Sequence, residues 1–256
     1  MSWALLAAGA LVAVRAGACL PWGMPSGGTS SVTDGVFSME GDLANLPAIV
    51  SLAERYDALV IVDDSHGLGV LGATGRGTAE HFGLLGRIDA ITGTLGKALG
   101  GAAGGFVASS QSIVDYLAQR SRPQLFSNAL PPAVLGAALG PLDVLEAERD
   151  RVQRLHANAQ YMRQGLRRLG YHPLEGESAI VPIISGDTAA AMALSDRLFA
   201  RGVYVVGFGF PVVPEGAARL RVQVSAAHMR EHLDRALAAF ADLAPGGQKE
   251  TVVTTG

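Results

Sequence analysis

The stretch Ala58-Leu59-Val60-Ile61-Val62-Asp63-Asp64-Ser65-His66 decides the fold class of this chain. Its first five residues are all apolar, which is typical of a short strand buried on both faces of a parallel sheet. Two acids and an imidazole follow at once, at the end of the strand where open α/β sheets bind ligands. The alternative is a solvated turn whose aspartates cap the next segment, and this stretch alone does not decide between the two.

Helical and strand patterns alternate from Val32 to about residue 243. Residues 45–57 predict an amphipathic helix with Asn45 as its N-cap. Helix patterns followed by buried strands favour an α/β fold with a largely parallel sheet. The further predicted strands are 89–93, 105–108, 180–184, 203–208 and 220–224, and the further predicted helices are 110–120, 131–169, 188–201 and 229–243. No strand is predicted upstream of Val32.

Composition excludes several classes of protein. The 256 residues include 20 basic and 23 acidic side chains, a net charge of −3, so nothing favours a nucleic-acid partner. A hydrophobic content of 49% with 17% charged residues excludes intrinsic disorder of the whole chain. The single cysteine, Cys19, permits no intramolecular disulfide and no cysteine-based metal site, and we predict no metal. Glycine, at 33 residues, is unusually abundant.

The first 31 residues lack the alternating helix and strand patterns of the rest of the chain. The apolar run 3–14 is 12 residues long, too short for a membrane span, which needs about 20. A signal peptide is the alternative, but no basic residue precedes Arg15. A start-site or frame-shift artefact would also account for this segment. We predict a cytoplasmic protein without a membrane partner, and a flexible connection over 21–31.

A second predicted strand end leads into Thr94-Leu95-Gly96-Lys97. A lysine between small residues can pack into a site where desolvation lowers its pKa, which suits a Schiff-base lysine. The alternative is a solvated surface charge. Glycine runs at 67–77 and 93–105 flank these residues, and we expect them to let the backbone approach a cofactor. The G-x-G-x-x-G at 67–72 lacks the strand-to-helix context of a dinucleotide site.

Two further stretches carry polar groups suited to anions. Arg219 and Arg221 alternate along a predicted strand, so both face one way and could hold a substrate carboxylate, unless they are solvated on an edge strand. Ser127 and Asn128 precede a predicted helix and could hold a phosphate, unless they form an ordinary N-cap.

Five stretches together resemble the α-oxoamine synthase family of fold-type I pyridoxal phosphate (PLP) enzymes. They are VTDGVFSMEGDLANLP (32–47), VDDSHGLGVLG (62–72), ITGTLGKALGGAAGG (91–105), RSRPQLFSNALPPA (120–133) and FPVVPEGAARLRVQVSAAH (210–228). The resemblance runs from Val32 to Leu243 and is nearest to the acetyl-specific members. It implies an aspartate aminotransferase-like fold, with residues 1–31 outside the family, 32–145 in the PLP-binding large domain and 146–244 in a small domain. The tail at 245–256 shows no periodicity, and we predict that it is disordered.

The resemblance also implies a role for each matching residue. Lys97 would carry PLP as a Schiff base and act as general base, and Asp63 would pair with the protonated pyridine nitrogen. His66 and Ser38 would hydrogen-bond the phenolic oxygen, and Thr94 would hold the phosphate. The remaining implied residues are Ser127 and Asn128, which reach the phosphate of the partner subunit in a homodimer, and Arg221, which binds the glycine carboxylate.

The implied reaction condenses glycine with acetyl-CoA to 2-amino-3-oxobutyrate and CoA, a step of threonine catabolism. Sibling synthases that form 8-amino-7-oxononanoate, 5-aminolevulinate or sphingoid bases share these residues and remain alternatives, as does a non-catalytic remnant of the fold. Family members carry well over a hundred more residues upstream of the Ser38 motif, so we expect an N-terminally truncated chain that is poorly active or inactive alone.

Overall fold

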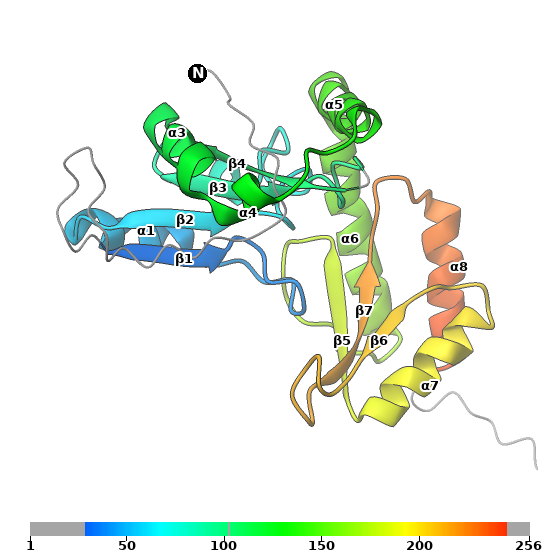
Figure 1. Ribbon diagram of the computed structural model, residues 1–256. Helices are drawn as coiled ribbons and strands as arrows, with labels where there is room; N and C mark the ends of the chain where they lie inside the picture. Colours follow the sequence, from blue (N-terminus) through cyan, green and yellow to red (C-terminus); the bar gives the residue numbers. More distant parts are fainter. Residues whose placement is uncertain (1–28, 102, 245–256) are drawn as a thin grey trace, which may run out of the picture. The chain divides into compact units, whose positions relative to one another are not determined.

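A computed structural model describes residues 29–101 and 103–244 (Figure 1), so the predictions for the apolar run 3–14, most of the 21–31 connection and the 245–256 tail lie outside the described residues. The chain divides into two compact units. Unit 1 contains the described residues up to Phe37 together with Leu43–Val152, and unit 2 contains Ser38–Asp42 together with the chain from Gln153. Among the described residues, no helix combines the length and apolar character needed to cross a membrane.

Unit 1 is built on a four-stranded sheet in the order β1-β2-β3-β4 (Figure 1). Strands β1 (Ser30–Asp34), β2 (Leu59–Asp63) and β3 (Ala90–Thr94) are parallel, and β4 (Gly105–Ser109) is antiparallel to β3. The register places Asp34 opposite Asp63, and Asp63 opposite Thr92. The carboxyl ends of the first three strands therefore lie at one edge of the sheet.

The prediction that no strand lies upstream of Val32 is wrong, because strand β1 begins at Ser30. Its residues, Ser-Ser-Val-Thr-Asp, include none that is fully buried. β1 is an edge strand held by parallel pairing with β2, so it needs no apolar run. Neither an apolar run nor a clear alternation therefore marked it in the sequence.

Helix α1 (Leu46–Arg55) covers one face of this sheet, as its amphipathic pattern predicted. The side chain of Asn45 accepts a hydrogen bond from the Ala48 N–H at 3.3 Å, which confirms the N-cap. Its apolar stripe forms one core with β2 and Leu84, made of Ala44, Leu46, Val50, Ala53, Val60, Val62 and Leu84. The other helices of unit 1 are α2 (Thr78–His81), α3 (Gln111–Arg120), α4 (Arg122–Phe126) and α5 (Pro132–Ala147).

The single helix predicted over 131–169 is wrong, because the chain forms two helices there. Helix α5 ends at Ala147 and α6 (Asp150–Arg168) begins after a break at Glu148 and Arg149. Glu148 has φ −118° and ψ 64°, outside the helical region, although its N–H still bonds to Val144 O. All the residues at the break are compatible with a helix, so composition gave no signal of it. The division between the units falls just beyond this break, after Val152.

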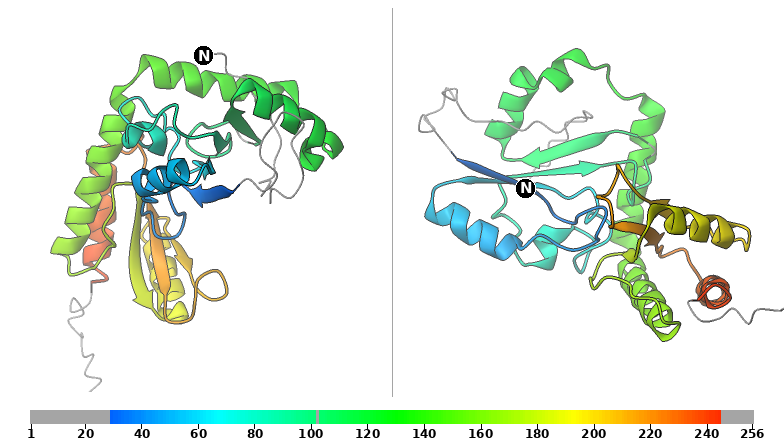
Figure 2. Two further views of the ribbon diagram at one scale, coloured as in Figure 1. Left: turned by 90° about the vertical axis from the view of Figure 1, so that its left-hand side faces the viewer. Right: turned by 90° about the horizontal axis from the view of Figure 1, so that it is seen from below.

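Unit 2 contains a three-stranded antiparallel sheet in the order β5-β7-β6. Its strands are β5 (Ile180–Gly186), β6 (Val206–Phe208) and β7 (Ala218–Gln223), and its other helices are α7 (Thr188–Phe199) and α8 (Arg230–Ala241). Helices α6 and α8 run side by side (Figures 1 and 2). A Cβ at Gly165 of α6 would lie 2.6 Å from Leu237 Cδ2 of α8, so this glycine permits their close packing.

Candidate active site

Three carboxylates lie at the carboxyl edge of the unit 1 sheet. Asp63 Oδ1 accepts a hydrogen bond from Ser65 N at 2.9 Å, and its Oδ2 makes none with the described residues. Asp34, opposite it on β1, was missed because β1 itself was missed. Partial burial raises the pKa of Asp34 above its ordinary value, Asp63 raises it further, and Lys97 lowers it. Asp63 and Lys97 therefore both act electrostatically on Asp34.

Asp64 is a structural acid, and the solvated-turn interpretation is wrong for it. The residue is 0% exposed, and its Oδ2 accepts a hydrogen bond from Thr78 N at 2.7 Å, at the first residue of α2. A Cβ on Gly35, Gly67 or Gly77 would collide with the Asp64 carboxylate. Gly77 also has φ +83°, which other residues adopt only with strain. At 67 and 77 the missing side chains thus make room for Asp64, not for a cofactor.

Burial raises the pKa of Asp64 to about 6. The hydrogen bonds with Thr78 lower the pKa, and the nearby charge of Asp63 raises it by a smaller amount than burial does. The folded protein therefore binds more protons than the unfolded chain between pH 4 and 6, and Asp64 makes stability fall as the pH rises through this range. The shift corresponds to about 3 kcal/mol at neutral pH.

Asp64→Asn should remove this penalty, because the amide stays neutral and its oxygen can still accept from Thr78 N. Measured by urea unfolding, the variant should gain about 2–3 kcal/mol relative to the original chain between pH 4 and pH 7.5. A difference between the two proteins that does not change with pH would contradict this assignment.

Lys97 lies in the loop between β3 and β4. Leu95 and Leu99 on either side are buried against Ala138 of α5, and they turn the Lys97 side chain outward. Of the two alternatives for Lys97, a packed site or a solvated charge, the described residues show the second: its side chain is exposed. Its amine forms no hydrogen bond or ion pair with the described residues. Lys97 is one of two lysines in the whole chain, the other being Lys249.

The remaining candidates of unit 1 lie around these groups or further along the chain. Thr94 braces the Lys97 loop, since its Oγ1 donates to Gly104 O and accepts from Gly96 N, both at 3.2 Å. His66 is half-buried in the turn that follows β2. Ser127 and Asn128 are exposed between α4 and α5. They are not the N-cap of a helix, because Pro131 occupies that position for α5.

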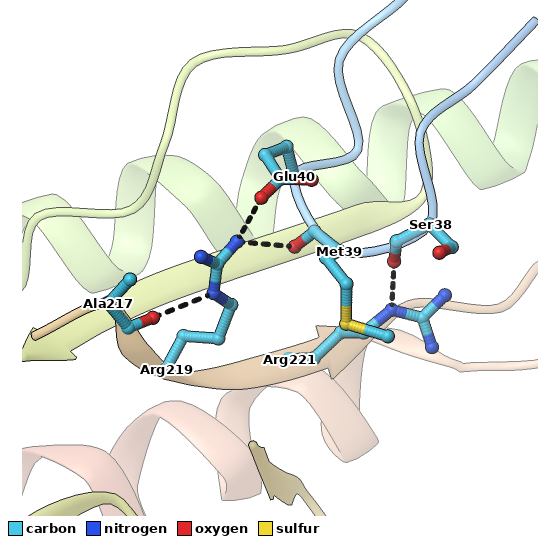
Figure 3. Close-up of polar contacts among 6 residues, drawn as sticks. All are labelled: Ser38, Met39, Glu40, Ala217, Arg219 and Arg221. Atoms are coloured by element: carbon cyan, nitrogen blue, oxygen red, sulfur yellow. Dashed lines mark hydrogen bonds and ion pairs between the residues drawn. The ribbon is translucent and has the colours of Figure 1, made fainter. Parts of the chain in front are cut away.

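The two arginines of unit 2 lie on the central strand β7, so the edge-strand alternative is wrong (Figure 3). Both contact the segment Ser38–Asp42, which confirms that they face the same way. Arg219 Nη1 donates to Glu40 Oε1 at 2.6 Å and to Met39 O at 3.2 Å. Arg221 uses only Nε, which donates to Ser38 O at 2.7 Å.

Burial lowers the pKa of Arg221 below its ordinary value, yet the group stays charged at any physiological pH. Its two terminal nitrogens form no hydrogen bond with the described residues, so Arg221 retains donors for a carboxylate. The sequence singled out Ser38 for its hydroxyl, but in unit 2 its backbone carbonyl is the group that contacts Arg221. No sequence pattern marked Glu40 as a site residue, because its partner, Arg219, is 179 residues away along the chain.

Comparison with known proteins identifies the family. Residues 31–240 match the aminotransferase class I and II family. The chain is 49% identical over 208 residues to the 2-amino-3-ketobutyrate coenzyme A ligase of Escherichia coli (strain K12), and 51% identical over 209 residues to the 8-amino-7-oxononanoate synthase of Exiguobacterium sibiricum. These matches cover 81% and 82% of this chain but 52% and 53% of the relatives, so the chain spans about half the length of the curated relatives it matches.

Solved structures give the same answer. The serine palmitoyltransferase of Sphingomonas wittichii superimposes with a TM-score of 0.81 at 33% identity, over 85% of this chain and 56% of that one. The 8-amino-7-oxononanoate synthase of Francisella tularensis gives 0.70 at 30% identity, over 86% of this chain and 64% of that one. The predicted fold class is confirmed, and the chain belongs to the class I and II aminotransferase family, with the fold of the fold-type I PLP-dependent transferases.

Proposed function

We propose that this chain carries the residues with which an α-oxoamine synthase uses PLP to condense glycine with acetyl-CoA. The products are 2-amino-3-oxobutyrate and CoA. One observation carries the proposal. Asp63, which has an uncommitted oxygen, ends β2, and Lys97, which is exposed and has no hydrogen-bond partner among the described residues, follows the neighbouring parallel strand β3; both act electrostatically on Asp34. The likeness to the ligase of Escherichia coli supports the choice of substrates.

The described residues fit PLP. Asp63 Oδ2 is available to accept a hydrogen bond from a protonated ring nitrogen, whose pKa a carboxylate raises. The Lys97 amine is accessible for covalent attachment. His66 and Ser38 are assigned to the phenolic oxygen and Thr94 to the phosphate. Two further residues, Ser127 and Asn128, are assigned to the phosphate of a second subunit. Beside them Phe126 is 83% exposed, an apolar surface suited to a homodimer contact.

When bound, PLP supplies an electron sink for charge that develops on the substrate Cα. Arg221 would hold the glycine carboxylate with its terminal nitrogens. The Lys97 amine would take the proton from glycine Cα, which makes it the general base. The electron pair left on Cα forms the bond to the thioester carbonyl carbon, the C–S bond breaks, and CoA leaves as the thiol once protonated.

A second candidate is a synthase that takes a longer acyl-CoA. It is favoured by the 51% identity to the 8-amino-7-oxononanoate synthase of Exiguobacterium sibiricum, which is close to the 49% identity to the ligase of Escherichia coli. The two candidates share every assigned residue, so only the acyl group separates them.

Thiol release in the presence of glycine and PLP tests the proposal. We expect only slow glycine-dependent CoA release, because the chain spans about half the length of its curated relatives. The value of kcat/KM should be at least about tenfold higher for acetyl-CoA than for acyl-CoA thioesters of eight or more carbons, since each methylene that a pocket accepts or rejects changes binding by about 1–3 kcal/mol. Preference for the longer thioesters would favour the second candidate. No glycine-dependent release from any thioester would contradict both.

A further inference from the structure

The segment Ser38–Asp42 is held on unit 2 by contacts from four of its consecutive residues. Arg221 Nε bonds to Ser38 O, Arg219 Nη1 bonds to Met39 O and to Glu40, and Ser178 Oγ donates to Gly41 O at 2.6 Å (Figure 3). Gly41 has φ +71°, and a Cβ there would lie 2.9 Å from Ile180 Cβ. The segment is therefore seated in one position on the strands.

Arg219 is the centre of this attachment. Its side chain is 5% exposed, and its guanidinium bonds to three acceptors, Ala217 O through Nε at 3.1 Å and Met39 O and Glu40 Oε1 through Nη1. The two arginines that looked equivalent in the sequence therefore differ in how they are bonded: Arg219 uses Nε and Nη1 to hold the protein, whereas Arg221 uses only Nε among the described residues.

Arg221 depends on the segment for its orientation. A guanidinium is planar, so one fixed N–H and the Cδ–Nε bond together set the direction of the two terminal nitrogens. Ser38 O supplies that fixed point. Ser38 itself stays in place because Met39 and Glu40, next along the chain, are held by Arg219. Errors of even 1 Å in such a group are costly in binding and catalysis.

We propose that Arg219 and Glu40 are positioning residues for Arg221. By seating the Ser38–Asp42 segment on β7, their ion pair keeps Ser38 O where it aligns the Arg221 guanidinium for the carboxylate of an amino-acid substrate. The identity of the ligand of Arg221, an amino-acid carboxylate, rests on the proposed function. The alignment of Arg221 by the segment stands on the contacts themselves.

The experiment compares Arg219→Gln and Glu40→Gln with a matched control, Arg167→Gln. Arg167 pairs with Glu175 in the same unit at the same N–O distance, 2.6 Å, but on the surface. In the PLP-loaded chain, the two test variants should weaken glycine binding about tenfold, and the acetyl-CoA KM should change less than about twofold. Arg219→Lys should not rescue binding, because an ammonium cannot replace the planar fork. The control should match the original chain.

A measurement that needs no substrate makes the proposal independent of activity. Solvent exchange of the Arg221 Nε–H, followed by NMR, should be slow in the original chain and in Arg167→Gln, and at least about tenfold faster in Arg219→Gln. Unchanged exchange in Arg219→Gln would overturn the proposal. So would faster exchange with unchanged glycine binding, since Arg221 would then need no positioning.

Arg221→Gln separates this proposal from the proposed function. If Arg221→Gln also leaves glycine binding unchanged, or if glycine does not bind at all, the assignment of Arg221 to the substrate fails. The Nε–H exchange in Arg219→Gln then still decides whether Arg219 aligns Arg221.

Discussion

Lys97→Ala should abolish glycine-dependent turnover, with a loss of at least about 10³-fold, because general-base catalysis alone contributes about 10²–10⁴-fold. The variant also loses the amine that would attach the cofactor. The same loss is expected in the exchange of the glycine α-hydrogen with D₂O, which requires proton removal but no thioester.

Folding should be unaffected by this change. The Lys97 side chain is exposed and has no hydrogen-bond or ion-pair partner among the described residues, so the free energy of unfolding should stay within about 0.5 kcal/mol. Lys249→Ala provides the matched control, since it removes the only other lysine, and should keep full activity. Residual α-hydrogen exchange above the rate of free PLP in Lys97→Ala would contradict the role of Lys97 as the base.

Asp63→Asn should lower kcat by about 10²-fold or more, because an amide cannot keep the cofactor ring nitrogen protonated and each pKa unit lost there costs about 1.4 kcal/mol. The Asn oxygen can still accept from Ser65 N, so the local fold is retained. Steady-state rates at saturating glycine and acetyl-CoA measure the effect.

The neighbouring Asp64→Asn is the matched control for Asp63→Asn. It makes the same chemical change one residue later, on a carboxylate that is buried among glycines and bonded to Thr78 N. It should change the pH dependence of stability and leave kcat within about twofold. Equal losses of activity in the two variants would mean that Asp63 acts only through the local fold.

The alternation of helix patterns with buried strands, of which the stretch 58–66 is the clearest, predicted the α/β class, because a buried strand and its polar end are local features. Helix α1 and its Asn45 cap were predictable for the same reason. Strand β1 was not, because an edge strand built of Ser, Val, Thr and Asp relies on pairing with β2. The break between α5 and α6 was missed because the residues around it all favour helix.

Within the candidate site, motif resemblance proposed the residues, and the structure revealed what holds them. The roles of Asp64, Arg219 and Glu40 depend on partners 14 to 180 residues away, and no local pattern marks such pairs. The glycine excess was predicted to serve a cofactor, whereas Gly35, Gly67 and Gly77 enclose Asp64. A buried carboxylate and the small residues around it are recognisable only once the chain is folded.

The most direct test of the central claim, that Lys97 holds PLP, is the site of covalent labelling. The chain is incubated with stoichiometric PLP, reduced with borohydride, digested and examined by mass spectrometry. Because the chain has two lysines, the result is a choice between Lys97, Lys249 and the terminal amine. We expect the phosphopyridoxyl group on Lys97, with glycine added before reduction lowering its yield. Labelling spread over Lys249 and the terminal amine, with Lys97 unmodified, would contradict the account.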